Sequence, residues 1–158
     1  PKYIFPLSKC LFVGINFLLT LIPLYAVIIF TGTEITWLHL LLPYACICLF
    51  MFTLGMGLIL ATISVFFRDM FYIYGIVTMM WTYLTPIMYD INMLDKSLIP
   101  ILKINPLYHY INFVRMIIIY KQVPSLESWI ACALSSIVFL IFGLILFKKK
   151  QDKFIYYV

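Results

Sequence analysis

The chain has 158 residues, of which 65% are hydrophobic and 11% are charged, and its formal net charge at pH 7 is +5. A soluble domain carries about 45–50% apolar and about 25% charged residues, and one of this size could not hide so much apolar surface. Lipid is the solvent that suits this composition. The positive charge forms no basic stripe, so nucleic acid is not an expected partner. It gathers at the lysines after residue 147, where membrane proteins keep cytoplasmic lysines.

Four apolar runs are predicted to cross a bilayer, for which about 20 residues are needed. The second run contains Gly55 and Gly57, where a neighbouring helix can approach closely. Arg68-Asp69 separates the second run from the third and is expected at a water interface, because charge inside the membrane is costly. Pro86 is expected to kink the end of the third run. In chain order the runs are 10–30, 37–67, 70–89 and 129–147.

The segment 90–128 is too long for a turn and too apolar for an exposed loop. Pro100 is expected to divide it into helical segments 91–99 and 101–120. Asn105 is a typical N-cap and Pro106 a typical first helical residue. The helix that they begin is too short to span, so we expect it to lie in the interface or to dip in and return. Its predicted apolar face is Leu107, Ile111, Val114 and Ile118, and its other face carries Tyr108, Asn112 and Arg115.

The lysines and arginines indicate the orientation. With a cytoplasmic start, that side holds seven of them and the opposite side holds four, so both ends of the chain are predicted to be cytoplasmic. The first group is Lys2, Lys9, Arg68, Lys148, Lys149, Lys150 and Lys153; the second is Lys96, Lys103, Arg115 and Lys121. The fold class expected is all-α: a polytopic membrane protein with four transmembrane helices and short re-entrant or interfacial helices between the third and fourth.

Four motifs in order carry a family resemblance. They are the segment through Phe5-Pro6 before a span, the helix from Gly55 to Arg68-Asp69, Pro86-Ile-Met-Tyr89 followed by Asn105-Pro106 and Arg115, and Gly143-Leu-Ile-Leu-Phe147 with its basic tail. Together they resemble ABC-2 type permeases of polysaccharide and polyol phosphate export, which move O-antigen, capsule and teichoic acid chains. The similarity runs over nearly the whole of 1–158, a single ABC-2 type transmembrane domain.

The resemblance implies a transport subunit with no chemistry and no cofactor of its own. Such permeases have six spans, of which this chain would supply the last four, its N-terminal part being absent. They work as homodimers with two ABC ATPase subunits, which bind ATP and Mg²⁺, and they export a lipid-linked glycan across the bacterial cytoplasmic membrane. The sequence itself lacks a Gly-rich phosphate-binding loop ending in Gly-Lys-Ser/Thr.

Three sets of residues are candidates for function under this resemblance. The ATPase-coupling set is Tyr3, Phe5, Pro6, Arg68 and Asp69. An interfacial lead-in to a membrane helix explains Phe5 and Pro6 equally well, and from the residues alone a cytoplasmic boundary pair is the favoured explanation of Arg68-Asp69. The outer-gate and substrate-path set is Pro86, Tyr89, Asn105, Pro106, Tyr108 and Arg115. The channel-aromatic set is Tyr72, Tyr74, Trp81 and Tyr83, whose rings suit the C–H edges of sugars but also suit membrane interfaces.

Other classes of protein stay open. A membrane-embedded transferase or hydrolase needs a cluster of acids and histidines, and the chain has six acids and two histidines without such a cluster. An ABC-2 exporter of a drug or lipid and a four-span assembly protein are the further alternatives. The four cysteines all lie in apolar runs and are expected to pack as small hydrophobes rather than to form a disulfide or bind a metal.

Overall fold

A computed structural model of the chain describes residues 4–32, 34–67, 69–87, 89 and 99–150, and throughout these ranges every regular element is helical. The predicted all-α class is therefore confirmed for this part of the chain. The elements are α1 (Ile4–Phe30), a 3₁₀ helix η1 (Trp37–Leu41), α2 (Leu42–Phe66), α3 (Met70–Leu84), α4 (Ile99–Ile104), α5 (Pro106–Ile118) and α6 (Leu126–Lys150).

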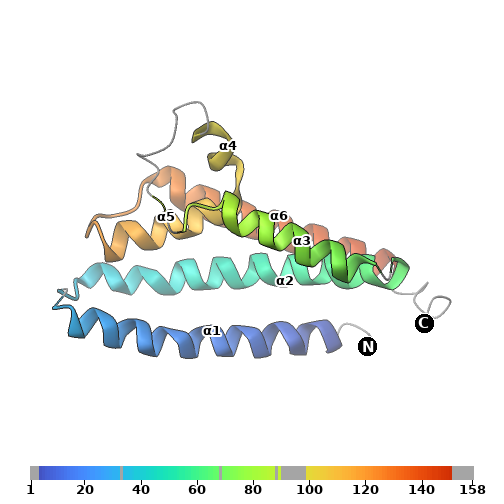
Figure 1. Cartoon of the computed structure of the whole chain (residues 1–158), viewed down its shortest axis with the longest axis horizontal. Coiled ribbons are helices and arrows are strands. Elements are labelled where there is room, and N and C mark those ends of the chain that lie inside the picture. The colour runs from blue at the N-terminus through green and yellow to red at the C-terminus, as the bar shows by residue number, and fades with distance from the viewer. Residues whose placement is uncertain (1–3, 33, 68, 88, 90–98, 151–158) are drawn as a thin grey trace.

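The long helices α1, α2 and α6 lie roughly parallel and define two ends of the bundle (Figure 1). We call one the hairpin end, where residues 31–36 join α1 to η1 and residues 119–125 join α5 to α6. We call the other the lysine end, where α1 begins, α2 turns into α3, and α6 finishes at Lys148, Lys149 and Lys150. In Figure 1, α3 runs from the lysine end towards the middle, and α5 continues from there to the hairpin end.

Three helices in the described residues are long and apolar enough to cross a membrane: Pro6–Phe30, Trp37–Phe66 and Leu126–Lys150. They correspond to the first, second and fourth predicted runs. The third predicted run, 70–89, differs, because α3 has 15 residues and is about 22 Å long at 1.5 Å per residue. A typical hydrocarbon core is about 30 Å thick, so α3 falls short of a full span by itself.

The end of α3 corrects the sequence-based expectation. Pro86 does not kink a continuing helix. The helix stops at Leu84, and Thr85 is extended, with φ −90° and ψ 126°. A proline disfavours the helical conformation of the residue before it, which explains this stop. Pro100 also differs from expectation, because it lies inside α4 rather than between two helices. The break falls at Asn105, and the segment 91–98 lies outside the described residues.

The tightest packing joins α2 to α6 where Gly55 meets Gly143. A Cβ built on Gly143 would collide with the carbonyl oxygen of Gly55, and one built on Gly55 would collide with the backbone of Phe139. Small residues allow this approach, which membrane helices use because lipid supplies no hydrophobic drive between them. The close approach predicted at Gly55 is thus confirmed, and a Cβ on Gly57 would lie 3.0 Å from the Cys10 sulfur of α1.

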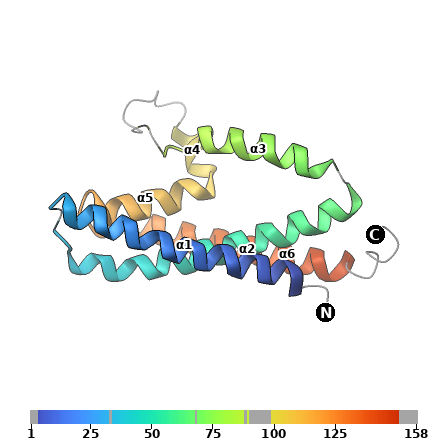
Figure 2. The ribbon, with the colours of Figure 1, turned by 60° about the horizontal axis from the view of Figure 1, so that its bottom comes forward.

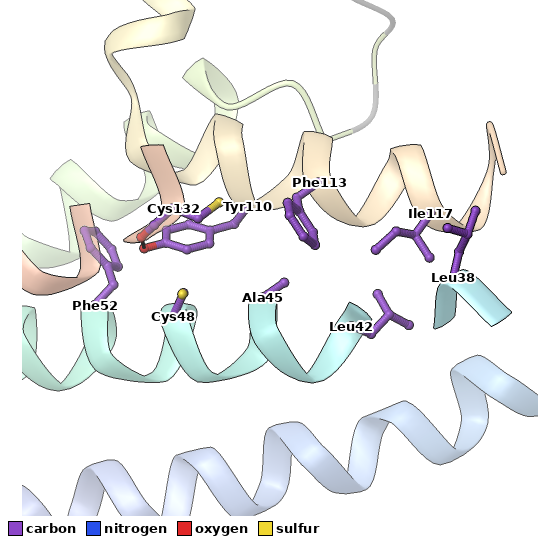
Figure 3. Close-up of a cluster of buried hydrophobic side chains, with 9 residues drawn as sticks. All are labelled: Leu38, Leu42, Ala45, Cys48, Phe52, Tyr110, Phe113, Ile117 and Cys132. Carbon is purple, nitrogen blue, oxygen red and sulfur yellow. Dashed lines mark hydrogen bonds between the residues drawn. The ribbon is translucent and has the colours of Figure 1, made fainter. Parts of the chain in front are cut away.

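The main core lies between α2, α5 and α6 (Figure 3). Phe113 and Ile117 of α5 and Cys132 of α6 are fully buried there, opposite Ala45 and Cys48 of α2. Both of these cysteines pack as small hydrophobes, as expected.

The face that α5 buries was predicted incorrectly. Its buried residues include Tyr110, Phe113 and Ile117, whereas Ile111 of the predicted apolar face is only half-buried. Tyr108, which the sequence placed on the other face with Asn112 and Arg115, is also buried. The remaining members of the predicted apolar face, Leu107, Val114 and Ile118, flank the buried stripe and pack against the core.

Candidate functional site

The first residues of α5 follow the capping pattern expected from the sequence. Asn105 has extended backbone angles, φ −71° and ψ 117°, and its side-chain oxygen Oδ1 accepts a hydrogen bond from the backbone N–H of Leu107 at 3.1 Å. Pro106 follows as the first helical residue, where a missing N–H costs nothing. The predicted N-cap is confirmed.

The same asparagine is also bonded to α3, which no local pattern indicates. Its Oδ1 accepts a second hydrogen bond from the indole Nε1–H of Trp81 at 2.9 Å, and its Nδ2 donates to the hydroxyl of Thr85 at 2.9 Å. Asn105 is 7% exposed and Thr85 is 1% exposed. A buried polar group left without a partner is costly, and these residues satisfy one another. We call Trp81, Thr85 and Asn105 the α3–α5 clasp.

The end of α3 is shaped to present Thr85 to the clasp. The Thr85 backbone N–H and hydroxyl both donate to the carbonyl of Trp81, at 3.0 and 2.7 Å. Its hydroxyl hydrogen is thereby occupied, which leaves the oxygen lone pair free to accept from Asn105. Pro86 follows and is fully buried. The turn after α3 is therefore fixed by a proline, a helix-end hydrogen bond and the amide of Asn105.

Two further predicted gate residues bond to carbonyls at this turn. Arg115 of α5 donates through Nη2 to the carbonyl of Ile87 at 2.8 Å. The hydroxyl of Tyr89 donates to the carbonyls of Tyr83 and Leu84 at 3.3 and 3.4 Å. Tyr83 and Leu84 are the last residues of α3, where carbonyls lack intrahelical partners, and Tyr89 supplies them, while Arg115 binds a carbonyl of the turn beyond the helix. The structure thus gathers Pro86, Tyr89, Asn105, Pro106 and Arg115 around one joint.

The aromatic residues predicted to line a channel divide into two groups. Trp81 is half-buried, packs against the main core and gives its N–H to the clasp. Tyr72, Tyr74 and Tyr83 are exposed, with 78%, 43% and 71% of their surface accessible. Their exposure leaves these rings open to a neighbouring molecule or to lipid.

The residues predicted to couple to an ATPase are only partly described. Tyr3 and Arg68 lie outside the described residues, and the side chain of Phe5 does too, although its backbone is in α1. Pro6 is half-buried in the first turns of α1, and Asp69 is exposed immediately before α3. Both belong to the lysine end, because α1 and α3 begin there (Figure 1). Their predicted role stays a prediction.

Sequence reasoning missed the hydroxyls that tie α5 and α2 to α6. Tyr110 of α5 donates to the carbonyl of Cys132 at 3.1 Å, a bond drawn in Figure 3, and it shares a 2.9 Å hydrogen bond with Ser135. Tyr44 of α2 donates to the carbonyl of Trp129 at 3.0 Å. The available signal was the spacing of Tyr110, Phe113 and Ile117 on one helix face.

Two ion pairs join segments that are distant in the sequence. Lys121 lies 3.3 Å from Glu34, and Lys103 lies 3.6 Å from Glu127. All four side chains are at least 41% exposed, so each pair contributes little free energy. Among the described residues, no three His, Cys, Asp or Glu side chains come together in a way that could hold a metal ion.

Comparison with known proteins shows the family of this chain. Residues 3–119 match the model of the ABC-2 type transporter family, which is about three quarters of the chain, and the chain belongs to that family. It is 29% identical over 98% of its length to the O-antigen export system permease protein RfbA of Myxococcus xanthus. It is 27% identical, over 98% of its length, to the protein of the same name from Klebsiella pneumoniae. It spans 60% of the length of each of these relatives.

Proposed function

We propose that this chain is part of the membrane subunit of an ATP-driven ABC exporter that moves a cell-surface polysaccharide across the bacterial cytoplasmic membrane. The observation that carries the proposal is similarity over 98% of the chain to permeases named for O-antigen export. Membership of the ABC-2 family and three helices of membrane-spanning length support the same reading. The cargo proposed is a lipid-linked glycan, either O-antigen-like or a polyol phosphate.

The exporter would be a homodimer of permeases with two separate ATPase subunits. ATP and Mg²⁺ would bind to those partners, because this sequence has no Walker-type phosphate loop. The apolar surface of the chain supports assembly with other helices in the membrane. In particular, α3 has no buried residue, which makes it a candidate to face a second permease or the transported glycan.

The lysine end would be cytoplasmic and would dock the ATPase. Lys148, Lys149 and Lys150 at the end of α6 support this orientation, since basic residues accumulate on the cytoplasmic side. Pro6 near the start of α1 and Asp69 before α3 belong to that same end, which supports the coupling role proposed for the set of Tyr3, Phe5, Pro6, Arg68 and Asp69.

The opposite, hairpin end would carry the outer gate. There α4 and α5 would act as short re-entrant helices, and α3, though short, would complete a fourth crossing together with them. The exposed rings of Tyr72, Tyr74 and Tyr83 would give a sliding glycan many weak contacts. Such contacts suit a channel better than a tight binding site does, because a transported chain must also leave.

The experiment that tests this proposal is purification of the tagged protein, as the cell produces it, in mild detergent. We expect an ATP-binding cassette protein to co-purify in equal amount. The double variant Phe5→Ala, Pro6→Ala is expected to lose that partner. Phe12→Ala is the control, because Phe12 lies further along α1 with 64% of its surface exposed. Absence of an ATPase even after mild cross-linking would contradict the proposal and would favour a membrane assembly protein.

A further inference from the structure

The helix α3 is attached to the rest of the molecule mainly at its two ends. It begins close to the end of α2, where the Met70 N–H donates to the Phe67 carbonyl at 3.1 Å, and then diverges from the bundle (Figure 2). None of its residues is buried. Near its other end, Trp81 packs against the main core and bonds to Asn105. A helix supported in this way can move as a rod between two joints.

By contrast, α5 is packed firmly into the bundle. Phe113 and Ile117 have no exposed surface, and Tyr110 is hydrogen-bonded to α6 (Figure 3). A displacement of α3 along its own axis therefore acts on α5 through the contacts between them. It shifts α5 and the helices packed on it, or it breaks the contacts between α3 and α5.

Those contacts are specific in their chemistry. Two N–H groups, from Leu107 and Trp81, converge on Asn105 Oδ1, and the Nδ2 amide donates to Thr85. Only a side chain with an acceptor and a donor on the same planar group can make all three bonds, which is what an amide offers. Aspartate lacks the donor, and leucine lacks both. The hydrogen bond from the Arg115 guanidinium to the Ile87 carbonyl is a second link between α5 and the segment that follows α3.

We propose that the α3–α5 clasp of Trp81, Thr85 and Asn105 transmits movement of α3 from the lysine end to α5, with Asn105 as the positioning residue. This inference rests on the proposed function, in which the lysine end meets the ATPase and α5 belongs to the outer gate. It adds a defined route between the two: the start of α3 at the lysine end, the length of α3, the clasp, and the first turn of α5.

The test uses hydrogen exchange of the backbone amides of α5 in the native permease bound to its ATPase, with and without a non-hydrolysable ATP analogue. Coupling between distant sites is typically about 5–150-fold, so we expect the analogue to change α5 exchange at least about fivefold in the wild-type protein. Thr85→Val removes the hydroxyl of the clasp in a side chain of the same shape, and Trp81→Phe removes the indole N–H while keeping an aromatic ring. Both are expected to abolish the α5 response and to lower glycan export per ATP hydrolysed.

Thr78→Val is the matched control. Its hydroxyl is also on α3 but bonds only to the carbonyl of Tyr74 in its own helix, at 2.7 Å. It is expected to keep both the α5 response and the wild-type export per ATP. If Thr85→Val and Trp81→Phe lowered stability alone, α5 would still respond to the analogue, and that result overturns the inference.

The possible failures can be told apart. If the ATPase binds and the wild type exports glycan, but α5 does not respond or responds equally in Thr85→Val, only the clasp inference fails. If α5 loses its response and export per ATP is unchanged, transmission through the clasp is also refuted. If no ATPase associates with the wild-type protein, the proposed function fails and the transmission route fails with it.

Discussion

Replacing Gly55 with alanine should destabilise the bundle, because α2 and α6 are in backbone contact there. A Cβ at this position would lie 2.6 Å from the Leu140 nitrogen and closer still to the Phe139 carbonyl group. Ordinary contacts begin near 3.4 Å, so the helices must separate by about 1 Å. A gap of that size forfeits about a quarter to a half of the dispersion energy of the atoms on either side.

The expected magnitude combines two opposing contributions. Overpacking of this kind costs about 1–3 kcal/mol, whereas alanine is a better helix former than glycine by about 1 kcal/mol. Gly75→Ala in α3 isolates the second contribution, because a Cβ there meets nothing within 4 Å. The free energy of unfolding of Gly55→Ala should therefore fall about 1–3 kcal/mol below that of Gly75→Ala.

Equilibrium unfolding in lipid–detergent bicelles, titrated with SDS, measures both variants on one scale. Gly143→Ala should resemble Gly55→Ala, because a Cβ on Gly143 collides with the Gly55 carbonyl. The double variant should cost less than the two single variants together, since the first separation already makes room for the second methyl group. Equal stability of Gly55→Ala and Gly75→Ala would refute the close helix crossing.

Three further changes are expected to act through separate mechanisms. Phe113→Ala opens a cavity at a fully buried site and should cost about 3–5 kcal/mol in the same unfolding assay, far more than Phe71→Ala at a residue that is 72% exposed. Tyr110→Phe removes the hydroxyl bonded to the Cys132 carbonyl and should cost about 0.5–1.5 kcal/mol, while Tyr83→Phe should cost nothing measurable. Gly32→Ala should cost about 1–2 kcal/mol, because Gly32 has φ +66° and only the backbone conformation opposes the methyl group.

Local signals in the sequence predicted most of the helical framework. Apolar runs of membrane length identified α1, α2 and α6, because composition alone determines whether a segment can lie in lipid. Asn105-Pro106 predicted the start of α5 correctly, since both the N-cap bond and the proline preference act within one turn. Gly55 was correctly singled out as a close-approach site.

The wrong or missing predictions concern features that depend on contacts with residues distant in the sequence. The buried face of α5 was misassigned because Tyr110 was left out of it, although its hydroxyl finds partners inside the bundle and its ring packs as a hydrophobe. Trp81 was singled out for its ring alone. Its indole N–H donates a hydrogen bond to Asn105, 24 residues further along the chain, and no periodicity within α3 indicates that bond.

The α3–α5 joint shows the same limit. The sequence placed Pro86, Asn105 and Arg115 in one functional set through a family resemblance, and the structure brings them to one turn. It did not predict Thr85, whose importance depends on an extended backbone before Pro86 and a hydroxyl aimed at the amide. These are consequences of three-dimensional packing, which residue types in order do not specify.

The most direct test of the proposed export role is to delete the gene for this protein in its native organism and to measure surface glycan and lipid-linked glycan separately. We expect the glycan to disappear from the surface and its lipid-linked form to accumulate on the inner side of the cytoplasmic membrane. The wild-type permease should reverse both changes only with an ATPase partner able to hydrolyse ATP. Unchanged surface glycan, with no lipid-linked glycan accumulating inside, would contradict the assignment of this chain to polysaccharide export.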